Sequence, residues 1–542
     1  MTSVLVIGGY GGFGGRLSRT LSRHGHDVLV GGRSLQKAAA FCEGVERARP
    51  VRIDRTGDVS SVLAAERPDI VVDASGPFQH SGYDLVEACI AARIAYLDLA
   101  DARGFVTGIA RHDEAAKAAG IPVIAGASSV PALSGAVIGH LAAGIDRVTA
   151  IEIAISASSR AAAGNSVAEA ILGGVGQAFN LWQGRRWQVA HGWQSMRPES
   201  FALSSGQSLN TRLVALADVP DLGLLPLRFA GVSAVSFRAG TESGLANTAL
   251  WLASWAVRWG MLRSLSAGKN WLLPAQRLTA LWGGDRSGMI VRVFGFIGER
   301  RVERRWSLIA ETGDGPEIPT LAAALLVGKI ARGEVAPGAR DAGEALTLRE
   351  FEPLFAQLAI KHATIEIAQP NPLYRRVMGA EFDRLAPALR RLHGVLRDHG
   401  AQGRGVVERG RHPLTRLIAT VLRFPKEGEH ALHVHFRETN GAEHWTRDFG
   451  GQRFSSVLRE RGSQLIERFG PLRFHFTLRA DDNGGLAMEM RRWSFFGLPL
   501  PLALAPRSPA REWEADGLFH FDVPIDVPLI GRVIHYHGWL GP

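Results

Sequence analysis

The sequence predicts an α/β protein in three parts. A parallel sheet wound by helices comes first, a central α+β domain with a mostly antiparallel sheet follows, and a β-rich α+β domain ends the chain. Short apolar strands alternate with helices at first, longer strands of alternating polarity follow, and strand signals dominate the last third. We expect the domains to cover residues 1–135, 136–370 and 371–542.

The composition is that of an ordinary globular chain. Its 542 residues are 46% hydrophobic and 21% charged, which excludes a disordered or collagen-like protein. Two cysteines, and a strand-like run directly after Met1, indicate a cytoplasmic protein without a signal peptide. The net charge of +10 is spread thinly, with no basic run interleaved with aromatic residues, so we expect no nucleic-acid partner.

The first expected strand, Ser3–Gly9, runs directly into a glycine-rich turn. The turn reads Gly9-Tyr10-Gly11-Gly12-Phe13-Gly14, a G-x-G-x-x-G match, and a helix follows it. Such glycines let the backbone approach a pyrophosphate, and the first N–H groups of the helix face the phosphates. A strand before the motif and a helix after it predict a Rossmann-type domain. The expected cofactor contacts here are Gly9, Gly11, Gly12, Phe13 and Gly14.

The second expected strand, Asp27–Val30, ends in Gly31-Gly32-Arg33-Ser34. NAD-binding domains place an acidic residue near this point to hold the ribose 2′-hydroxyl, and this turn has none. Arg33 and Ser34, with Lys37 one helical turn later, instead suit a 2′-phosphate. The turn therefore predicts NADP(H) as the cofactor. The alternative is that Arg33 is a solvated loop residue.

Further strands, separated by helices, are expected at residues 51–54, 70–73, 94–99 and 121–126. Ligands of such parallel sheets bind outside the carboxyl ends of the strands. The cofactor contacts expected at these ends are Asp54, Ala74, Ser75 and Gly76. The candidate catalytic residues are His80, Asp98 and Asp101. The alternatives are a solvated loop histidine for His80, and a polar strand end and a cap for the two aspartates.

The N-terminal two-thirds of the chain resembles the saccharopine dehydrogenase/reductase-like NAD(P)-binding family, by motifs over about residues 1–135 and by layout alone in the central region. The motifs that carry this resemblance are Gly9–Gly14, Gly32–Ser34, Val71–Phe78, Tyr96–Asp101 and Ser128–Pro131. The last third is similar to a domain of unknown function that is often fused behind such reductase-like parts. Its pattern includes Tyr374, His393, Arg411–Leu414, Glu443–Arg447, Phe469–Pro471 and Gly538–Leu540.

The resemblance implies an NADP(H)-dependent oxidoreductase with a small-molecule substrate. We expect that substrate to be apolar or amphipathic, because the central region holds a tryptophan-rich apolar helix. Short-chain dehydrogenase catalysis is disfavoured, since no tyrosine is followed four residues later by lysine. The alternative function is a catalytically weak NADP(H)-binding sensor or scaffold, whose C-terminal domain binds a lipid or a protein partner.

The central region is expected to form an open sheet with helices on one face. The resemblance implies that the last helices of this region return to the first domain. Strands are expected at Val148–Ser156, Met289–Ile297 and Val302–Glu311, and this sheet is a candidate surface for a homodimer. Residues 338–344 are expected to form a connecting loop.

The stretch 244–263 is strongly apolar and carries Trp251, Trp255 and Trp259 along one helical face. Its uncharged part is too short to span a bilayer. A buried helix over the central domain, and a helix in peripheral contact with a membrane surface, are the two alternatives.

In the last third an opening helix, Tyr374–His393, is expected to precede a set of strands. They are expected at His430–Glu438, His444–Phe449, Leu472–Leu478, Leu486–Phe495, Leu518–Val523 and Arg532–His537, with a hairpin turn at Asp481–Gly485. Two His-x-His pairs, His433/His435 and His535/His537, each point to one face of a strand. Cross-strand polar pairs explain them better than a metal does, so we expect no metal site.

Overall fold

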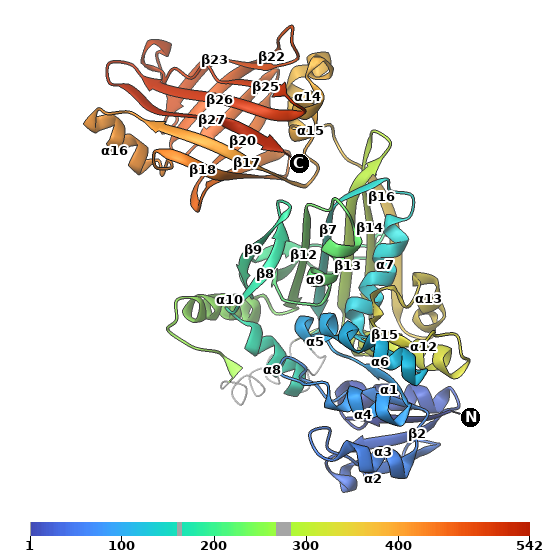
Figure 1. Ribbon diagram of the computed structural model, residues 1–542. Coiled ribbons are helices and arrows are strands. Elements are labelled where there is room, and N and C mark those ends of the chain that lie inside the picture. Colours follow the sequence, from blue (N-terminus) through green and yellow to red (C-terminus); the bar gives the residue numbers. More distant parts are fainter. Residues whose placement is uncertain (1, 160–164, 267–282, 542) are drawn as a thin grey trace.

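The computed structural model describes residues 2–159, 165–266 and 283–541, which form three large sheets (Figure 1). A seven-stranded parallel sheet lies at one end of the molecule, and a seven-stranded mixed sheet lies in the middle. An eleven-stranded antiparallel sheet lies at the other end. The predicted fold class is therefore confirmed in all three of its parts.

The parallel sheet has the strand order β15-β6-β5-β4-β1-β2-β3. Its strands are β1 (Ser3–Ile7), β2 (Asp27–Gly32), β3 (Ala48–Arg52), β4 (Ile70–Asp73), β5 (Ala95–Asp98), β6 (Pro122–Ala125) and β15 (Gly338–Asp341). The helices along it are α1 (Gly12–Arg23), α2 (Leu35–Cys42), α3 (Val59–Glu66), α4 (Asp84–Ala92), α5 (Arg103–Gly108) and α6 (Asp113–Ala119). Both faces of the strands are buried: Val4 and Val6 of β1 belong to one core cluster, and Leu5 and Ile7 belong to another. Strands buried on both faces read as continuous apolar runs, which is why this sheet is visible in the sequence.

The strand β15 corrects one expectation. Residues 338–344 do not form a connecting loop: they form β15, which pairs in parallel with β6, and a short 3-10 turn. Four residues with a single apolar side chain, Ala339, carry no alternation that could reveal a strand. The helix before it, α12 (Ile318–Ala331), packs against α1, where Arg16 and Glu317 form an ion pair of 3.5 Å. The chain thus returns to the first sheet after the central one.

The central sheet has the order β10-β11-β12-β7-β13-β14-β16 and is antiparallel except where β12 pairs with β7. Its strands are β7 (Arg147–Ala157), β10 (Arg197–Glu199), β11 (Arg212–Leu216), β12 (Ala234–Thr241), β13 (Ser287–Ile297), β14 (Arg300–Ala310) and β16 (Ile360–Ala368). The accompanying elements are α7 (Ser134–Ala142), α8 (Asn165–Gly174), α9 (Asp221–Arg228), α10 (Gly244–Arg258), α13 (Leu348–Ala356) and the hairpin of β8 (Ala178–Gln183) and β9 (Arg186–His191). One core cluster runs from Val4 of the first sheet to Phe355 beside the central sheet. The two sheets therefore share a hydrophobic core.

Helix α10 is half-buried. Asn247, Ser254 and Val257 are buried, whereas Leu245 is 81% exposed, and Trp259, directly after the helix, is 67% exposed. The predicted tryptophan stripe forms, since the ring centroids lie 6.3 Å apart for the first pair and 5.4 Å for the second. Among the described residues, no helix is long and apolar enough to cross a membrane.

The last sheet closes on itself. Its strands are β17 (Asp398–Arg409), β18 (Gly428–Thr439), β19 (Ala442–Phe449), β20 (Gln452–Arg461), β21 (Gln464–Phe469), β22 (Leu472–Ala480), β23 (Leu486–Phe495), β24 (Leu498–Leu500), β25 (Arg511–Ala515), β26 (Leu518–Val527) and β27 (Gly531–Gly541). Because β22 pairs with β23 as well as with β21, a ring forms, and β24 extends from β23. We call this ring the closed sheet. It has a core cluster of its own.

Three helices accompany the closed sheet: α14 (Leu373–Met378), α15 (Pro387–Leu392) and α16 (Pro413–Val421). The single opening helix expected over Tyr374–His393 is wrong. It is divided into α14, a 3-10 turn at Gly379–Arg384, and α15. Gly379 takes a φ of +60°, and Pro387 starts a new helix because proline cannot donate the backbone hydrogen bond of a helix interior.

Charged side chains join the closed sheet to the central sheet. Arg397 Nε donates to Glu152 at 2.5 Å, and Arg301 Nη2 donates to the backbone oxygen of Val395 at 2.6 Å. Arg186 of β9 pairs with Asp448 of β19 at 2.6 Å. A charged side chain that is buried needs a partner of opposite charge or a hydrogen bond. These contacts therefore help to fix the position of the closed sheet relative to the central sheet.

Candidate cofactor site

The glycine-rich turn between β1 and α1 is packed so closely that side chains are excluded. A Cβ atom on Gly14 would lie 2.2 Å from the carbonyl oxygen of Gly8, and one on Gly9 would lie 2.7 Å from that of Val6. A Cβ on Gly12 would meet nothing within 4 Å, so the start of α1 faces open space. Because the first N–H groups of a helix lack partners inside it, this open end suits an anion.

The residue that makes the sharp turn lies one position before the motif. Gly8 has a φ of +76°, a conformation that L side chains rarely adopt, and its backbone N–H donates to the backbone oxygen of Gly31 in β2. The sequence pattern begins its count at Gly9 and misses Gly8. A double glycine directly after an apolar strand is the signal that could have found it.

The end of β2 lies beside this turn. The Tyr10 hydroxyl accepts a hydrogen bond from the backbone N–H of Ser34 at 3.2 Å, and the Tyr10 ring covers Gly32 so closely that no side chain fits there. The Ser34 hydroxyl caps α2 by accepting from the N–H of Lys37 at 3.3 Å. Arg33 and Lys37 are both exposed. The structure thus places the backbone of Ser34 beside the glycine-rich turn, with Arg33 before it in the chain and Lys37 in the first turn of α2.

The ends of β3 and β4 hold a second group of polar residues. Asp54 is exposed beyond the end of β3, where its carboxylate accepts from the N–H and hydroxyl of Thr56 and its pKa is lowered by these bonds. Arg55, which the sequence reasoning did not single out, donates to Asp73 at 3.0 Å and lies over the Phe78 ring at 4.9 Å. No sequence pattern marks this arginine.

Ala74, Ser75 and Gly76 follow β4 at the same edge. The N–H of Ala74 donates to Ile7 of β1 at 2.9 Å, and the Ser75 N–H donates to Asp73 at 2.9 Å. The backbone of Ala74 and Ser75 also lies against Gly8. The expected cofactor residues after β1, β2 and β4 therefore meet at one edge, whereas Asp54 lies at the periphery of this group.

Asp98, at the end of β5, is completely buried. One carboxylate oxygen, Oδ1, accepts from the backbone N–H groups of Ala100 at 2.9 Å and Gly126 at 2.7 Å. Burial raises the pKa of Asp98 to about 7, because the charged form loses its hydration. The Asp98 carboxylate thus connects the loop after β5 to the loop after β6 by hydrogen bonds to their backbone N–H groups.

Asp101 and His80 lie nearer to solvent. Asp101 reaches solvent and accepts from the Gln79 amide at 3.4 Å, yet the surrounding protein limits its hydration and raises its pKa. His80 is exposed on the loop after β4. Arg103, two residues after Asp101, donates to the backbone oxygen of Asn180 in β8 and pairs with Asp218. The loops after β4 and β5 are thereby connected to the central domain.

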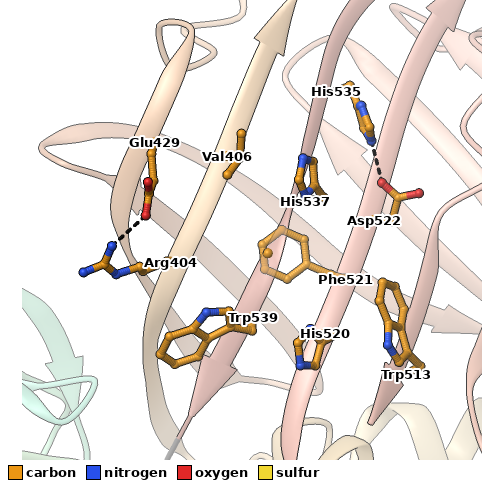
Figure 2. Close-up of a pocket in the computed structure, with 11 residues that line it drawn as sticks. Arg404, Val406, Glu429, Trp513, His520, Phe521, Asp522, His535, His537 and Trp539 are labelled. Atoms are coloured by element: carbon orange, nitrogen blue, oxygen red, sulfur yellow. Dashed lines mark hydrogen bonds and ion pairs between the residues drawn. The ribbon is translucent and has the colours of Figure 1, made fainter. Parts of the chain in front are cut away.

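The two His-x-His pairs lie elsewhere, in the closed sheet. His433 and His435 contact Gly184 and Asp398, each at 2.7 Å. Figure 2 shows the other pair on β27, in a shallow pocket where His535 contacts Asp522 of β26. Over the described parts of the chain, no group of three His, Cys, Asp or Glu side chains could hold a metal.

Comparisons with known proteins agree with both resemblances. Residues 4–124 match the family described as saccharopine dehydrogenase NADP binding domain, and residues 385–540 match a domain of unknown function, DUF4166. The first match supports a nicotinamide dinucleotide as cofactor and an oxidoreductase as the class of protein. A search of curated proteins finds no match.

Two solved structures match large parts of the chain at low identity. Apo saccharopine dehydrogenase (L-Glu forming) from Saccharomyces cerevisiae is 12% identical, with a TM-score of 0.45, over 67% of this chain and 100% of its own. Amine dehydrogenase from Mycobacterium smegmatis is 12% identical, with a TM-score of 0.36, over 63% of this chain and 95% of its own.

Proposed function

We propose that the protein is an NADP(H)-dependent oxidoreductase that acts on a small apolar or amphipathic molecule. The observation that carries this proposal is the glycine-rich turn. Gly9 and Gly14 have no room for a side chain, while Gly12 and the start of α1 face open space. Such a turn admits a pyrophosphate close to the backbone, where the helix N-terminus favours its negative charge.

The preference for NADP(H) over NAD(H) is supported by the residues at the end of β2. Arg33 is exposed there, Ser34 lies beside Tyr10, and Lys37 follows in the first turn of α2. A planar guanidinium recognises a phosphate through two parallel hydrogen bonds. No carboxylate follows β2 directly, so the acidic residue that holds the ribose 2′-hydroxyl in NAD-binding domains is absent from this turn.

When bound, the cofactor supplies or accepts a hydride, and the chain supplies position and a proton. Asp101 suits proton transfer, because it reaches solvent and its raised pKa retains the proton at a higher pH than an ordinary aspartate does. His80, exposed on the neighbouring loop, is the second candidate. For Asp98 we propose a positioning role, since its carboxylate fixes the backbone at Ala100 and Gly126.

Binding of both cofactors to the purified protein tests this proposal. We expect saturable binding of NADPH, at least about tenfold tighter than that of NADH, followed by consumption of NADPH with a member of a panel of apolar carbonyls and imines. Absence of binding of either cofactor contradicts the proposal. Tight binding without turnover of any panel member favours the alternative, a sensor or scaffold.

Two further partners belong to this proposal. An apolar substrate, or the surface of a membrane that contains it, is supported by the exposed apolar residues of α10 and the turn after it, among them Leu252, Trp259 and Met261. A homodimer is supported by β16, an edge strand of the central sheet nine residues long. Light scattering on the purified protein distinguishes a dimer from a monomer. A cytoplasmic location stays a prediction from the cysteine content.

A further inference from the structure

The closed sheet encloses a large apolar cavity of about 700 Å³. Its walls come from the strands β19 to β27 and consist mainly of aromatic, aliphatic and methionine side chains. Six of them are Phe454, Phe469, Phe474, Met488, Met490 and Val523. A volume in this range holds a small-molecule ligand, and an apolar cavity attracts apolar molecules rather than water.

Polar groups gather among the side chains that line the cavity. Tyr374 of α14 is fully buried, and its hydroxyl has no hydrogen-bond partner among the described residues. The Tyr374 ring stacks on His393 at 3.8 Å, and His393 contacts Glu512 at 2.7 Å. A buried hydroxyl without a partner is costly, so a hydrogen-bonding ligand would offset that cost.

Each charged side chain that lines the cavity has a polar or charged neighbour. Arg447 donates to the Ser456 hydroxyl at 3.1 Å and faces Glu467 at 3.8 Å. Glu512 has the His393 ring as its neighbour. One guanidinium and two carboxylates line the cavity, and each has a close neighbour, so a strongly charged head group finds no unpaired counter-charge among these residues.

The two ends of the ring differ in what covers them. At one end α14 packs on β20, where Arg376 pairs with Glu460 at 2.5 Å, and the helices α14 and α15 cover this end (Figure 1). At the other end Gln452 begins β20, and its side-chain oxygen accepts from the N–H of Lys426 in the segment that follows α16. Helix α16 therefore lies at the end of the ring opposite to α14 and α15.

Apolar residues surround the end of the ring that lies beside α16. Leu417 and Val421 of α16 line the cavity and yet are 59% and 71% exposed, and Phe496 is 76% exposed. Leu500 and Leu504, in the segment after β23, also both line the cavity and reach solvent. Side chains that face the cavity and solvent at once mark an opening, and its apolar rim would admit a hydrocarbon.

We propose that the closed sheet binds one molecule of an uncharged amphiphilic lipid, such as a long-chain alcohol or ester. Its hydrocarbon chain lies along the apolar walls, and its oxygen accepts a hydrogen bond from the Tyr374 hydroxyl. The ligand enters between α16 and the segment after β23. This proposal does not depend on the redox activity, because the cavity lies in a sheet with its own core.

Titration of the full-length protein with the uncharged fluorophore N-phenyl-1-naphthylamine tests the proposal. We expect saturable binding of one molecule per chain, displaced by hexadecan-1-ol more effectively than by hexadecanoate. Absence of saturable binding, or displacement by hexadecanoate at lower concentrations than by the alcohol, overturns it. NADPH binding, measured on the same sample, shows separately whether the proposed redox function holds.

Two variants locate the site. Tyr374→Phe removes only the hydroxyl, so we expect about five- to tenfold weaker displacement by hexadecan-1-ol and unchanged displacement by hexadecane. Tyr96→Phe makes the same change at a buried tyrosine of the first sheet and should leave both unchanged. Met490→Trp narrows the cavity and should weaken the binding of the fluorophore, of hexadecan-1-ol and of hexadecane. If hexadecan-1-ol displaces the fluorophore equally well from Tyr374→Phe and Tyr96→Phe, the proposed hydrogen bond from the Tyr374 hydroxyl to the ligand is overturned.

Discussion

Arg33 has its proposed role because of its neighbours as well as its charge. Tyr10 of the glycine-rich turn hydrogen-bonds the backbone of Ser34, which holds the end of β2 next to the start of α1. We therefore expect an arginine at this point to reach a phosphate on the ribose next to the pyrophosphate site. An arginine placed away from this turn could not make the same contact.

Changing Arg33 to Asp should therefore reverse the cofactor preference. We expect NADPH to bind about 10- to 100-fold more weakly, because a charge-assisted contact is lost and a like charge is introduced, while NADH binds as well or better. Arg93→Asp, the same change at an exposed arginine that follows α4, is the control. Titration of each variant with both cofactors measures the ratio, and an unchanged ratio in Arg33→Asp refutes the phosphate contact.

The titration of Asp98 should make the free energy of unfolding depend on pH. Its pKa in the folded protein is about 7, above its ordinary value of 3.8, so the folded state holds a proton that the unfolded state releases. Its contribution to the free energy of unfolding is therefore present at low pH and is lost as the pH rises toward 7. Asn at this position keeps the acceptor oxygen and does not titrate.

For Asp98→Asn we expect the free energy of unfolding, relative to the unchanged protein, to rise by up to ~3 kcal/mol between pH 5 and pH 8. Urea unfolding at the two pH values measures this difference. If Asp98 only positions the backbone of the two loops, the Asp98→Asn variant should still turn over substrate. Loss of turnover with unchanged stability and cofactor binding would instead make Asp98 a catalytic residue.

At the scale of single elements, α10 is the helix whose surroundings explain its sequence least. Asn247 ties its start to the backbone of Leu213 and Thr241, both at 2.9 Å, so one side is well anchored. The opposite side exposes Leu245 and Leu252. An apolar side chain in water gains about 25 cal/mol for each Å² that a partner covers, so this face favours a partner.

We predict that this face contacts a membrane surface. The unchanged protein should float with anionic vesicles, and Leu252→Asp should reduce the bound fraction several-fold, because a carboxylate is costly to bury and is repelled by anionic lipid. Leu227→Asp, at an 84%-exposed leucine of α9, is the matched control. If Leu252→Asp floats as well as the unchanged protein, α10 is not the contact.

At the scale of elements, the sequence predicts features that depend on contacts between residues close together in the chain. Features that depend on contacts between distant residues cannot be predicted from it. The turn after β1 is recognisable because its glycines are required by backbone contacts only a few residues apart. Strand β17 is hidden because Gly403 and Gly405 weaken the strand pattern, and their reason lies far along the chain: a Cβ on Gly403 would lie 1.9 Å from the oxygen of Trp539. Arg55 is hidden for the same reason, since Asp73 becomes its neighbour only in the folded sheet.

The whole molecule consists of two units of unequal independence. The first and central sheets share one hydrophobic core, whereas the closed sheet is built around its own. The central and closed sheets are joined by the charged contacts described above and by one small apolar cluster, in which Leu396 packs with Ala150 and Phe294. Such contacts contribute less to cooperative folding than a large shared apolar core does. The expected boundary at 370/371 therefore separates two hydrophobic cores, whereas the one at 135/136 lies within parts that share a core.

Expressed alone, residues 371–541 should fold and melt cooperatively, at a midpoint within about 10 °C of the same transition in the full chain. Residues 1–135 should not, because they lack β15 and α12. Thermal melting followed by circular dichroism measures both fragments. A cooperative transition in 1–135, or its absence in 371–541, contradicts this division.

The position of β15 also has a consequence during synthesis on the ribosome. Strand β6 is complete at Ala125, but its neighbour β15 begins only at Gly338. At a translation rate of ~5–20 residues per second, the edge of β6 stays unpaired for about tens of seconds until β15 has been synthesised. During that time an exposed strand edge can pair with other chains, so we expect slowed elongation between these strands to lower the yield of soluble protein.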